Sequence, residues 1–423
     1  MICKSCDPCR SGTGQLRAWE QEVTVNRSHK IPMRHQQIPG SEVVLSHRGA
    51  PRVAVIGAGI SGLSCARELV VRGYAPVVFE ASGRLGGRCS SLNTRIGWFD
   101  DGAQVIGAPT RLAAYATQRP GMLAALHPWT QPIAPSDTEY SGKGGGSDES
   151  EAIEDTVLEL IGAVGVPSMA ALAGEIAQPL DVRLNTPIDH VYRLGASWVL
   201  RCEANDIDED FQAVVLAVPA PLALPLAAES AELRAALGAV RYRSRWVLLL
   251  GSERAVGLPN HQVFQGGPIE RIVAMHSKPG RPSGLPQRWF IEANERWSHE
   301  HRFDDPETVA ELLHDNFQAC AKRTVIPSFL LAHQWHHAYA DMSVARSDQT
   351  KYWWDDKLLM GVCGDSVVAS QVDQVHRSGA LLAARIAESL IARRWRTAPQ
   401  AQVQKKVHRP IYSEHAGTAS PRF

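Results

Sequence analysis

Residues Val53 to Arg88 read VAVIGAGISGLSCARELVVRGYAPVVFEASGRLGGR and carry the pattern that decides the fold. A short apolar run, Val53 to Ile56, predicts a strand, and three glycines follow it with the spacing G-x-G-x-x-G. A helical pattern comes next and ends at Gly73, because glycine readily takes the left-handed conformation that ends a helix. A second apolar run, Pro76 to Phe79, leads directly to Glu80. Strand, glycine turn, helix, strand and acid, in this order, predict a dinucleotide-binding unit rather than an ordinary turn.

The glycines and the acid each have a physical role in holding a dinucleotide. Gly57 permits the tight turn, Gly59 lets the backbone approach a pyrophosphate, and Gly62 lets the helix pack closely on the strand. The helix N-terminus adds unpaired N–H groups and a positive dipole end for the phosphates. Glu80 would accept hydrogen bonds from ribose hydroxyls. The binding residues predicted in this unit are Gly57, Ala58, Gly59, Ile60, Ser61, Gly62, Glu80 and Ala81.

A second glycine cluster, GRLGGR at residues 83–88, follows the acid closely. It suits another loop on the pyrophosphate, with Arg88 offering a fork of donors; an ordinary glycine-rich loop with a solvated arginine is the alternative. The whole stretch resembles the FAD-binding start of the amine-oxidase-like flavoproteins, whose signature continues after the acid into GGR. Residues 99–104, FDDGAQ, resemble the D-x-G-A segment that this group places beside the flavin. The resemblance therefore adds Gly87, Arg88, Ala103 and Gln104 to the cofactor-binding residues.

The C-terminal part of the chain carries a matching junction. An apolar run, Leu358 to Val362, precedes Cys363, Gly364 and Asp365, and a helical pattern runs from about Gln374 to Arg394. In the flavoprotein class that the chain resembles, a strand ends in such a Gly-Asp pair. Its aspartate bonds the ribityl or pyrophosphate region, and the next helix points its N-terminus at the flavin, where it stabilises negative charge on the reduced ring.

The middle of the chain, Val182 to Glu203, predicts β-structure with turns at residues 185–187 and 195–197, and Phe211 to Val218 predicts a further strand. This region resembles the adenine-side β-insert and returning strand of FAD oxidoreductases, which would place Ile188 beside the adenine. A simple three-stranded meander is the other interpretation, and the two are compatible.

Later segments resemble the renalase-like branch of the FAD-dependent amine oxidase superfamily. They are GVPSMAALA at 165–173, RWFIEANERWS at 288–298, HQWHHAYA at 333–340 and YWWD at 352–355. Where relatives show His-Arg-Trp, this chain has Gln334, so a positive charge is missing. No catalytic residue is firmly assigned; the candidates are Trp297 and Trp335, from the branch-specific segments, and His336, with His276 and His337 as further proton-handling candidates.

The predicted fold class is α/β: a Rossmann-type FAD-binding domain, with a parallel sheet and a β-insert, plus an α+β substrate domain with a mixed sheet. The substrate domain is expected to contain strands near residues 245–250, 272–275 and 289–292 and a helix over 306–323. The predicted division is a disordered extension at 1–50; the FAD-binding domain at 51–110, 165–220 and 340–396; the substrate domain at 111–164 and 221–339; and a disordered tail at 397–423.

Composition excludes several partners. Lys plus Arg and Asp plus Glu are balanced at 44 each, so no charge excess favours nucleic acid or an anionic membrane. No apolar run is long enough to span a bilayer, and the N-terminus lacks a signal-peptide core, so a cytoplasmic location is expected. Residues 136–151 predict a surface loop. The oligomeric state is left open by the sequence.

The cysteine pattern argues against a disulfide framework. Five of the eight cysteines are scattered, as in reduced cytosolic proteins. Cys3, Cys6 and Cys9 have CxxCxxC spacing but no fourth ligand at matching spacing, although His29 or His35 could supply one, so no metal is predicted. Cys363 is expected to be a small buried residue at a strand end, with FAD bound non-covalently. Because residues 1–50 resemble nothing in the family, a start assigned too far upstream, with Met33 as the true start, is an alternative.

The preferred functional hypothesis follows from the resemblance. Renalase-like enzymes oxidise the 2- and 6-dihydro isomers of NAD(P)H by hydride transfer to flavin N5, and dioxygen accepts the electrons as hydrogen peroxide. The protein's contribution would be orientation and electrostatics. A flavin amine oxidase and an FAD-binding protein without turnover are the alternatives; a carotenoid-type desaturase is disfavoured because the composition offers no long apolar channel.

Overall fold

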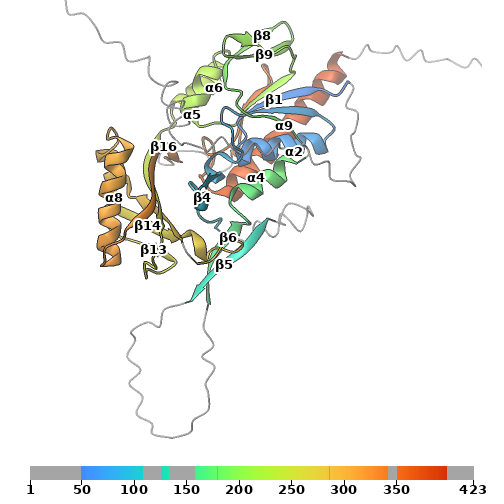
Figure 1. Cartoon of the computed structure of the whole chain (residues 1–423). Coiled ribbons are helices and arrows are strands. Elements are labelled where there is room, and N and C mark those ends of the chain that lie inside the picture. The colour runs from blue at the N-terminus through green and yellow to red at the C-terminus, as the bar shows by residue number, and fades with distance from the viewer. Residues whose placement is uncertain are drawn as a thin grey trace, which may run out of the picture. The chain divides into compact units, whose positions relative to one another are not determined.

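In the computed structural model of this chain, the described residues are 49–107, 125–132, 158–178, 180–284, 286–341 and 350–397. Two larger sheets carry most of their strands, and Figure 1 shows helices packed against both sheets. The first sheet holds the glycine motifs, and the second contributes one wall of the candidate site described below.

The first sheet has six strands in the order β17-β18-β11-β1-β2-β7. Five of them run parallel, and β17 pairs antiparallel to β18 at one edge. The bounds are β1 Arg52–Ile56, β2 Ala75–Phe79, β7 Asp181–Arg183, β11 Ala213–Leu216, β17 Trp353–Asp355 and β18 Met360–Val362. The strands β1, β2 and β11 are almost continuously buried, as expected of parallel strands covered on both faces.

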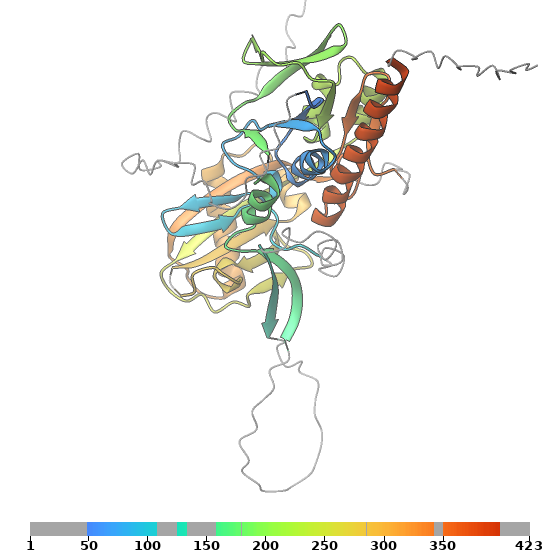
Figure 2. The same ribbon diagram turned by 90° about the vertical axis from the view of Figure 1, so that its right-hand side faces the viewer.

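Helices cover one face of this sheet. They are α2 (Ile60–Val71), α4 (Ala170–Ala177) and α9 (Val372–Thr397), and they share one core cluster with the side chains of Val53 and Val55. Figure 2 shows α9 running beside α2, although the two helices are about 300 residues apart in the chain. A Cβ added at Gly379 of α9 would lie 2.0 Å from the backbone oxygen of Ser61, so only glycine allows this close approach.

The opposite face of the six-stranded sheet has its own core cluster, which includes Ile56, Phe79 and Trp198. It is covered by the short helices α5 (Ala220–Leu226) and α6 (Ala231–Gly238) and by a three-stranded antiparallel sheet. The strands of that small sheet are β8 (Ile188–Leu194), β9 (Ser197–Cys202) and β10 (Asn205–Asp206). The predicted β-insert is therefore present as a three-stranded meander.

The second large sheet is antiparallel, in the order β13-β14-β15-β12-β16. Its strands are β12 Tyr242–Ser252, β13 His261–Val263, β14 Ile269–Ala274, β15 Gln287–Ala293 and β16 Pro327–Ala340. A short 3₁₀ turn, Met275–Ser277, follows β14, and α7 (Glu295–Glu300) follows β15. The mixed sheet was predicted for the substrate side, but the sheet there is antiparallel, and the mixed sheet is the six-stranded one, because β17 runs antiparallel to β18.

The two faces of this antiparallel sheet have different neighbours. On what we call the outer face, Trp246, Leu248 and Ile291 form a core with α8 (Pro306–Ala321), which Figure 1 shows lying along the sheet. On the inner face, side chains two residues apart on each strand, such as Val247, Leu249 and Phe290, join the core cluster that contains the glycine-motif helix α2. The inner face therefore looks toward the first sheet.

Two hairpins complete the described part. The first pairs β3 (Ser91–Thr94) with β4 (Gly97–Asp100) and follows the 3₁₀ turn Gly87–Cys89. The second pairs β5 (Leu126–Pro132) with β6 (Leu158–Gly165). Phe99 of β4 stacks on Phe329 of β16 at a ring-centre distance of 5.3 Å, so the first hairpin touches the inner face.

The fold class predicted from the sequence is confirmed, and the predicted elements are found within a few residues of their expected ends. The returning strand is shorter than predicted, Ala213–Leu216, because Ala217 and Val218 pack around the glycine turn. The predicted strand to Met275 ends at Ala274, where the 3₁₀ turn begins. The division into an FAD-binding and a substrate domain stays a prediction. Cys3, Cys6, Cys9, the 136–151 loop and the tail beyond residue 397 lie outside the described residues.

Candidate functional site

The glycine turn after β1 is built so that only glycine fits at two of its positions. Gly57 has φ +107°, and a Cβ there would lie 2.7 Å from the oxygen of Ala217. A Cβ at Gly62 would lie 2.0 Å from the oxygen of Gly57. Gly59 differs, because a Cβ there would meet no described atom within 4 Å. The open backbone at Gly59 is what a phosphate group needs in order to approach.

The N-terminus of α2 meets this open space. Gly59 precedes the helix without any side-chain cap, and the first hydrogen bond of the helix runs from the N–H of Leu63 to the oxygen of Gly59, 3.0 Å. The hydroxyl of Ser61 is buried and has no hydrogen-bond partner among the described residues. A buried polar atom without a partner is rare, so its presence at a helix N-terminus fits a site for an anionic ligand.

Glu80, at the end of β2, fixes the turn from the other side. One carboxylate oxygen accepts the N–H of Ala58 at 2.9 Å, and the other accepts the N–H and the hydroxyl of Ser82 at 2.9 and 2.8 Å. A carboxylate has about four acceptor positions, so Glu80 keeps capacity for further donors such as ribose hydroxyls.

The second glycine cluster lies directly on the first. The N–H of Gly86 donates to the oxygen of Ala58 at 2.9 Å, and a Cβ at Gly87 would lie 3.5 Å from the Cα of Gly59. The predicted flavin segment follows, because the N–H of Ala103 donates to the oxygen of Arg88 at 2.7 Å. The structure thus brings both glycine motifs and the DDGAQ segment to one place.

The C-terminal junction reaches the same place through Arg88. Its guanidinium forms a bidentate ion pair with Asp365, in which the Nη2–Oδ1 distance is 2.8 Å. Burial raises the pKa of Asp365, but the charge and hydrogen bonds of Arg88 outweigh it and hold this pKa below its usual range. Gly364, with φ +105°, brings its backbone to Ser61, from whose hydroxyl an added Cβ would be 3.5 Å away.

Tyr242 links this junction to the antiparallel sheet and was missed by the sequence analysis. Its hydroxyl donates to Asp365 at 2.9 Å, and burial raises its pKa. Arg88 also donates to the backbone oxygens of His337 and Ala338 on β16, at 3.1 and 3.2 Å. Tyr242 is the first residue of strand β12, and no sequence motif around it marks it as a site residue.

The remaining predicted residues fall in different places. Trp335 lies on the inner face, and its indole N–H donates to the backbone oxygen of Asp101 at 2.7 Å, so it touches the predicted flavin segment. Trp297 packs against the outer-face core and stacks on His301, so the structure does not bring it to this site.

His336 is exposed and alternates with Trp335 along β16. Ile188 is half-buried against the core beside Phe79, two residues after Thr186, whose N–H donates to the oxygen of Glu80.

Gln334 also falls on the outer side of β16. It pairs with Trp246 across the β12–β16 ladder, and Trp246 belongs to the core shared with α8. The positive charge that Gln334 lacks would therefore lie on the outer face, so its absence does not change the charge of the inner face.

Buried charges under the DDGAQ segment were not predicted. Asp100 is 1% exposed, and its Oδ2 lies 3.0 Å from the Nζ of Lys278 and 2.6 Å from a guanidinium nitrogen of Arg281. Burial raises the pKa of Asp100, but the two cations hold it below its usual range. Burial lowers the pKa of Lys278 to about 8 despite its partner. Lys278 also donates to Gln104 at 3.0 Å and so fixes a predicted flavin contact.

A second group of charged residues lies on the inner face beside Trp335. Glu292, 3% exposed, accepts two hydrogen bonds from Arg271, at 3.1 and 2.6 Å, and one from the hydroxyl of Tyr339 at 2.9 Å. Burial and the neighbouring Glu292 raise the pKa of Tyr339. Arg245, 6% exposed, lies over the Tyr339 ring at 5.4 Å. The available signal was the presence of charged residues, Arg245, Arg271 and Glu292, within largely apolar strands.

The cysteines follow the sequence analysis where they are described. Cys363 is buried, as expected, beside the buried thiol of Cys65, and all five described cysteines are free. Within the described ranges, no group of three or more His, Cys, Asp or Glu residues is arranged to hold a metal ion. In the same ranges, no helix has the length and apolar character needed to cross a bilayer.

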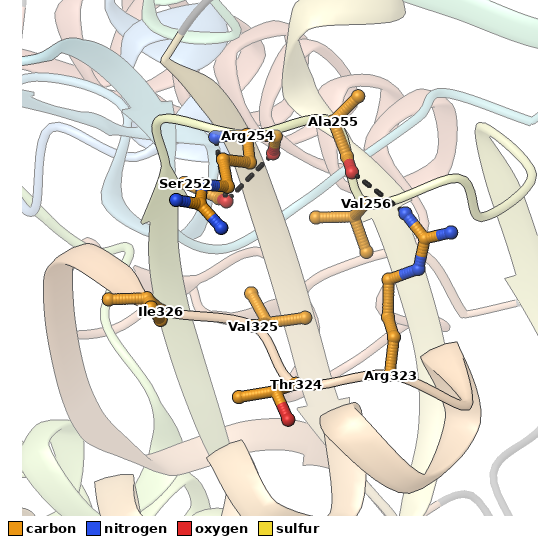
Figure 3. Close-up of a pocket in the computed structure, with 8 residues that line it drawn as sticks. All are labelled: Ser252, Arg254, Ala255, Val256, Arg323, Thr324, Val325 and Ile326. Atoms are coloured by element: carbon orange, nitrogen blue, oxygen red, sulfur yellow. Dashed lines mark hydrogen bonds between the residues drawn. The ribbon is translucent and has the colours of Figure 1, made fainter.

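A small hollow at the far end of β12 is separate from this site. Figure 3 shows it lined by Arg254 and Arg323 with Val256 and Val325, between the end of β12 and the loop that leads from α8 to β16. Arg323 donates to the backbone oxygen of Ala255 at 3.1 Å, and both arginines are exposed. None of the predicted site residues lines it.

The fold and the glycine-motif site define a Rossmann-type dinucleotide-binding protein that carries a second, antiparallel sheet. The family described as NAD(P)-binding Rossmann-like domain matches residues 55–118. Among solved structures, the chain is similar to cyclohexylamine oxidase from Brevibacterium oxydans IH-35A, with a TM-score of 0.58 and 14% identity, covering 81% of this chain and 100% of that one. It is also similar to wild-type putrescine oxidase bound to putrescine, with a TM-score of 0.56 and 13% identity, covering 81% and 99% of the two chains. At these identities the likeness shows the fold.

Curated relatives match a short stretch of this chain. Mitochondrial protoporphyrinogen oxidase of Nicotiana tabacum is 45% identical over 60 residues, which cover 14% of this chain and 12% of the relative. The flavin-containing amine oxidase of Danio rerio is 52% identical over 60 residues, 14% and 11% of the two chains. The matched stretch thus spans about an eighth of the length of these relatives.

Proposed function

We propose that this chain is an FAD-dependent oxidoreductase that holds FAD without a covalent bond. One observation carries the proposal: two glycine motifs and the Gly364–Asp365 junction, far apart in sequence, converge on the N-terminus of α2 and the unpartnered hydroxyl of Ser61. An extended dinucleotide needs such a set of donors with open backbone between them.

Different residues would contact different parts of that extended cofactor. Gly59, Ser61 and Gly87 would hold the pyrophosphate, Glu80 the adenosine ribose, and Ile188 would lie beside the adenine. At the other end, Asp365 would bond the ribityl region, and Ala103 and Gln104 would lie beside the flavin. These roles come from the resemblance; the supporting geometry is that Ala103 bonds to Arg88, and Arg88 pairs with Asp365.

When bound, FAD supplies a two-electron acceptor that takes a hydride at its N5 atom. The chain's own contribution is positioning and charge. Lys278 holds Gln104 at 3.0 Å, and Asp100 holds Lys278, so one side of the predicted flavin position is fixed by a buried network. Trp335 is fixed against the same segment through Asp101 and would form part of the substrate pocket.

For the substrate, we propose a reduced nicotinamide dinucleotide of the renalase type, the 2- or 6-dihydro isomer, with dioxygen as acceptor. The branch-specific segments support this choice, and one of them contains Trp335. The test is anaerobic: the yellow holoprotein is mixed with each isomer, with ordinary 4-dihydronicotinamide dinucleotide as the matched control. We expect the oxidised flavin band to disappear with the isomers only, and air to restore it with release of peroxide. A flavin band that persists with both isomers contradicts the proposal.

An amine oxidase is the second candidate, because the solved structures similar in fold include cyclohexylamine oxidase and putrescine oxidase. Peroxide release with a panel of primary amines, in the absence of nicotinamides, would select this candidate. Binding without turnover stays an alternative; Gln334 does not argue for it, since this residue pairs with an outer-face residue.

The non-covalent attachment has its own test. After acid precipitation we expect the yellow colour in the supernatant. A yellow pellet would mean a covalent bond to the chain.

A further inference from the structure

Arg245 is poorly satisfied for a buried arginine on the inner face. Its only hydrogen bond within the described part runs from Nη1 to the backbone oxygen of its neighbour Ser244, at 3.2 Å, and its Nε is buried without a partner. The carboxylates within 4 Å stay beyond hydrogen-bond distance: Glu270 and Glu295 lie 3.6 Å from Nη2, and Glu292 lies 4.0 Å from Nε. Arg271, by contrast, holds Glu292 through two bonds.

The unsatisfied atoms of Arg245 form one edge of its guanidinium. Nε and Nη2 present two parallel N–H donors, the arrangement that matches the two oxygens of a carboxylate or phosphate. Nη1 is the atom already used. Burying such an edge without an acceptor is costly, so a ligand that supplies the acceptor gains strongly.

The local charge also favours an anion. Arg245 and Glu292 are buried and Arg271 is 23% exposed, and the charges of these three sum to plus one. Glu270 and Glu295 are 38% and 48% exposed, so solvent and salt screen their charges, and Glu295 is already paired with Arg243 at 2.9 Å.

The position of Arg245 connects it to the predicted flavin segment. Arg245 pairs with Trp335 across the β12–β16 ladder, and both residues belong to the inner face. Trp335 in turn bonds to Asp101. An anion bound to Arg245 would therefore lie beside Trp335, which contacts the segment proposed to hold the flavin.

We propose that Arg245 is a specificity-determining residue of the substrate site and binds an anionic group of the substrate, a carboxylate or a phosphate, on its Nε–Nη2 edge. This inference rests on the proposed function and narrows its substrate class: the substrate carries an anion as well as the group that is oxidised. The guanidinium also lies over the Tyr339 ring, 5.4 Å from its centre, which is within the range of a cation–π contact.

The experiment measures binding by calorimetry on the full-length holoprotein, with benzoate, phenyl phosphate and the neutral isostere benzamide as probes. We expect benzoate or phenyl phosphate to bind at least tenfold more tightly than benzamide, and the stronger of the two identifies the anion. Arg245→Met should weaken the anion by about 10- to 100-fold and leave benzamide unchanged. Arg245→Lys, which keeps the charge and loses the fork, should retain only part of the preference.

The exposed arginines of the hollow in Figure 3 provide the control, since they are a second place where an anion could bind. Arg254→Met and Arg323→Met should leave the anion affinity unchanged. The proposal is overturned if these variants lose the anion, if Arg245→Met retains it, or if wild-type protein shows no preference over benzamide. Calorimetry needs no turnover, so an anion preference without flavin reduction would count against the proposed function alone.

Discussion

Replacing Asp100 by asparagine should destabilise the protein strongly, because this side chain neutralises two buried cations. Its Oδ2 faces Lys278 and Arg281 at 3.0 and 2.6 Å, while its Oδ1 accepts the N–H of Met169 at 2.9 Å and the hydroxyl of Ser91 at 2.8 Å. An amide has one acceptor oxygen and one donor nitrogen. In either orientation of the Asp100→Asn side chain, the amide nitrogen must therefore point at another donor.

The size of the effect follows from the burial of all three groups, whose side chains are 2% exposed or less. Removing one partner of a buried ion pair costs about 3–5 kcal/mol. For the roughly 300 residues that the structure describes, the entropy of unfolding is about 0.6 kcal/mol per kelvin, so the midpoint of thermal unfolding should fall by about 5–8 °C.

The assay compares thermal unfolding of Asp100→Asn with that of Asp206→Asn at neutral pH. Asp206 pairs with Arg201 at 2.7 Å but is 44% exposed, so solvent screens the pair and its loss should barely change the midpoint. Adding Lys278→Met to Asp100→Asn should recover part of the loss, because one unpaired cation disappears. Equal midpoints for the two single variants would refute the reasoning.

Three further outcomes are expected. Gly62→Ala should abolish flavin binding and lower the unfolding free energy by about 1–3 kcal/mol, because its methyl group would lie 2.0 Å from the oxygen of Gly57; full flavin content after purification would contradict this. Tyr242→Phe should lower the free energy of unfolding in denaturant by about 0.5–1.5 kcal/mol through loss of the bond to Asp365, and an unchanged midpoint would show that the bond contributes nothing. Burial lowers the pKa of His333 to about 4, so the unfolded chain binds a proton between about pH 6.5 and 4 that the folded chain does not. Stability should therefore fall as pH falls through this window, and His333→Gln should flatten that part of the curve of melting temperature against pH.

Local sequence predicted the nucleotide half of the site well. Gly57, Gly62 and Glu80 have roles that follow from backbone conformation and from their order along one βαβ unit, and such information is contained in about 30 neighbouring residues. Gly364 and Asp365 were found only through the resemblance, because a Gly-Asp pair by itself indicates no more than a turn.

The substrate-side wall was not predicted, since it depends on register between distant strands. Arg245 faces Trp335 only because β12 and β16 pair in one particular alignment, and Lys278 meets Asp100 across 178 positions of sequence. Trp297 shows the same limit of local sequence. Its segment resembles the renalase-like branch, yet the strand and helix around it place its side chain in the outer-face core. Side-chain alternation gives two possible faces, and only the tertiary pairing selects one.

The contact between Gly379 and Ser61 has a consequence for how the protein matures and how it can be cut. The nucleotide-gripping turn lies near residue 60, whereas α9, which packs closely on Ser61, lies about 300 residues further along the chain. A truncated product that ends before residue 350 would keep the entire glycine fingerprint and still lack the helix that packs on Ser61. Assembly of the grip should thus wait until α9 has been synthesised, and a protease that removes α9 should release the cofactor without touching a single residue of the fingerprint.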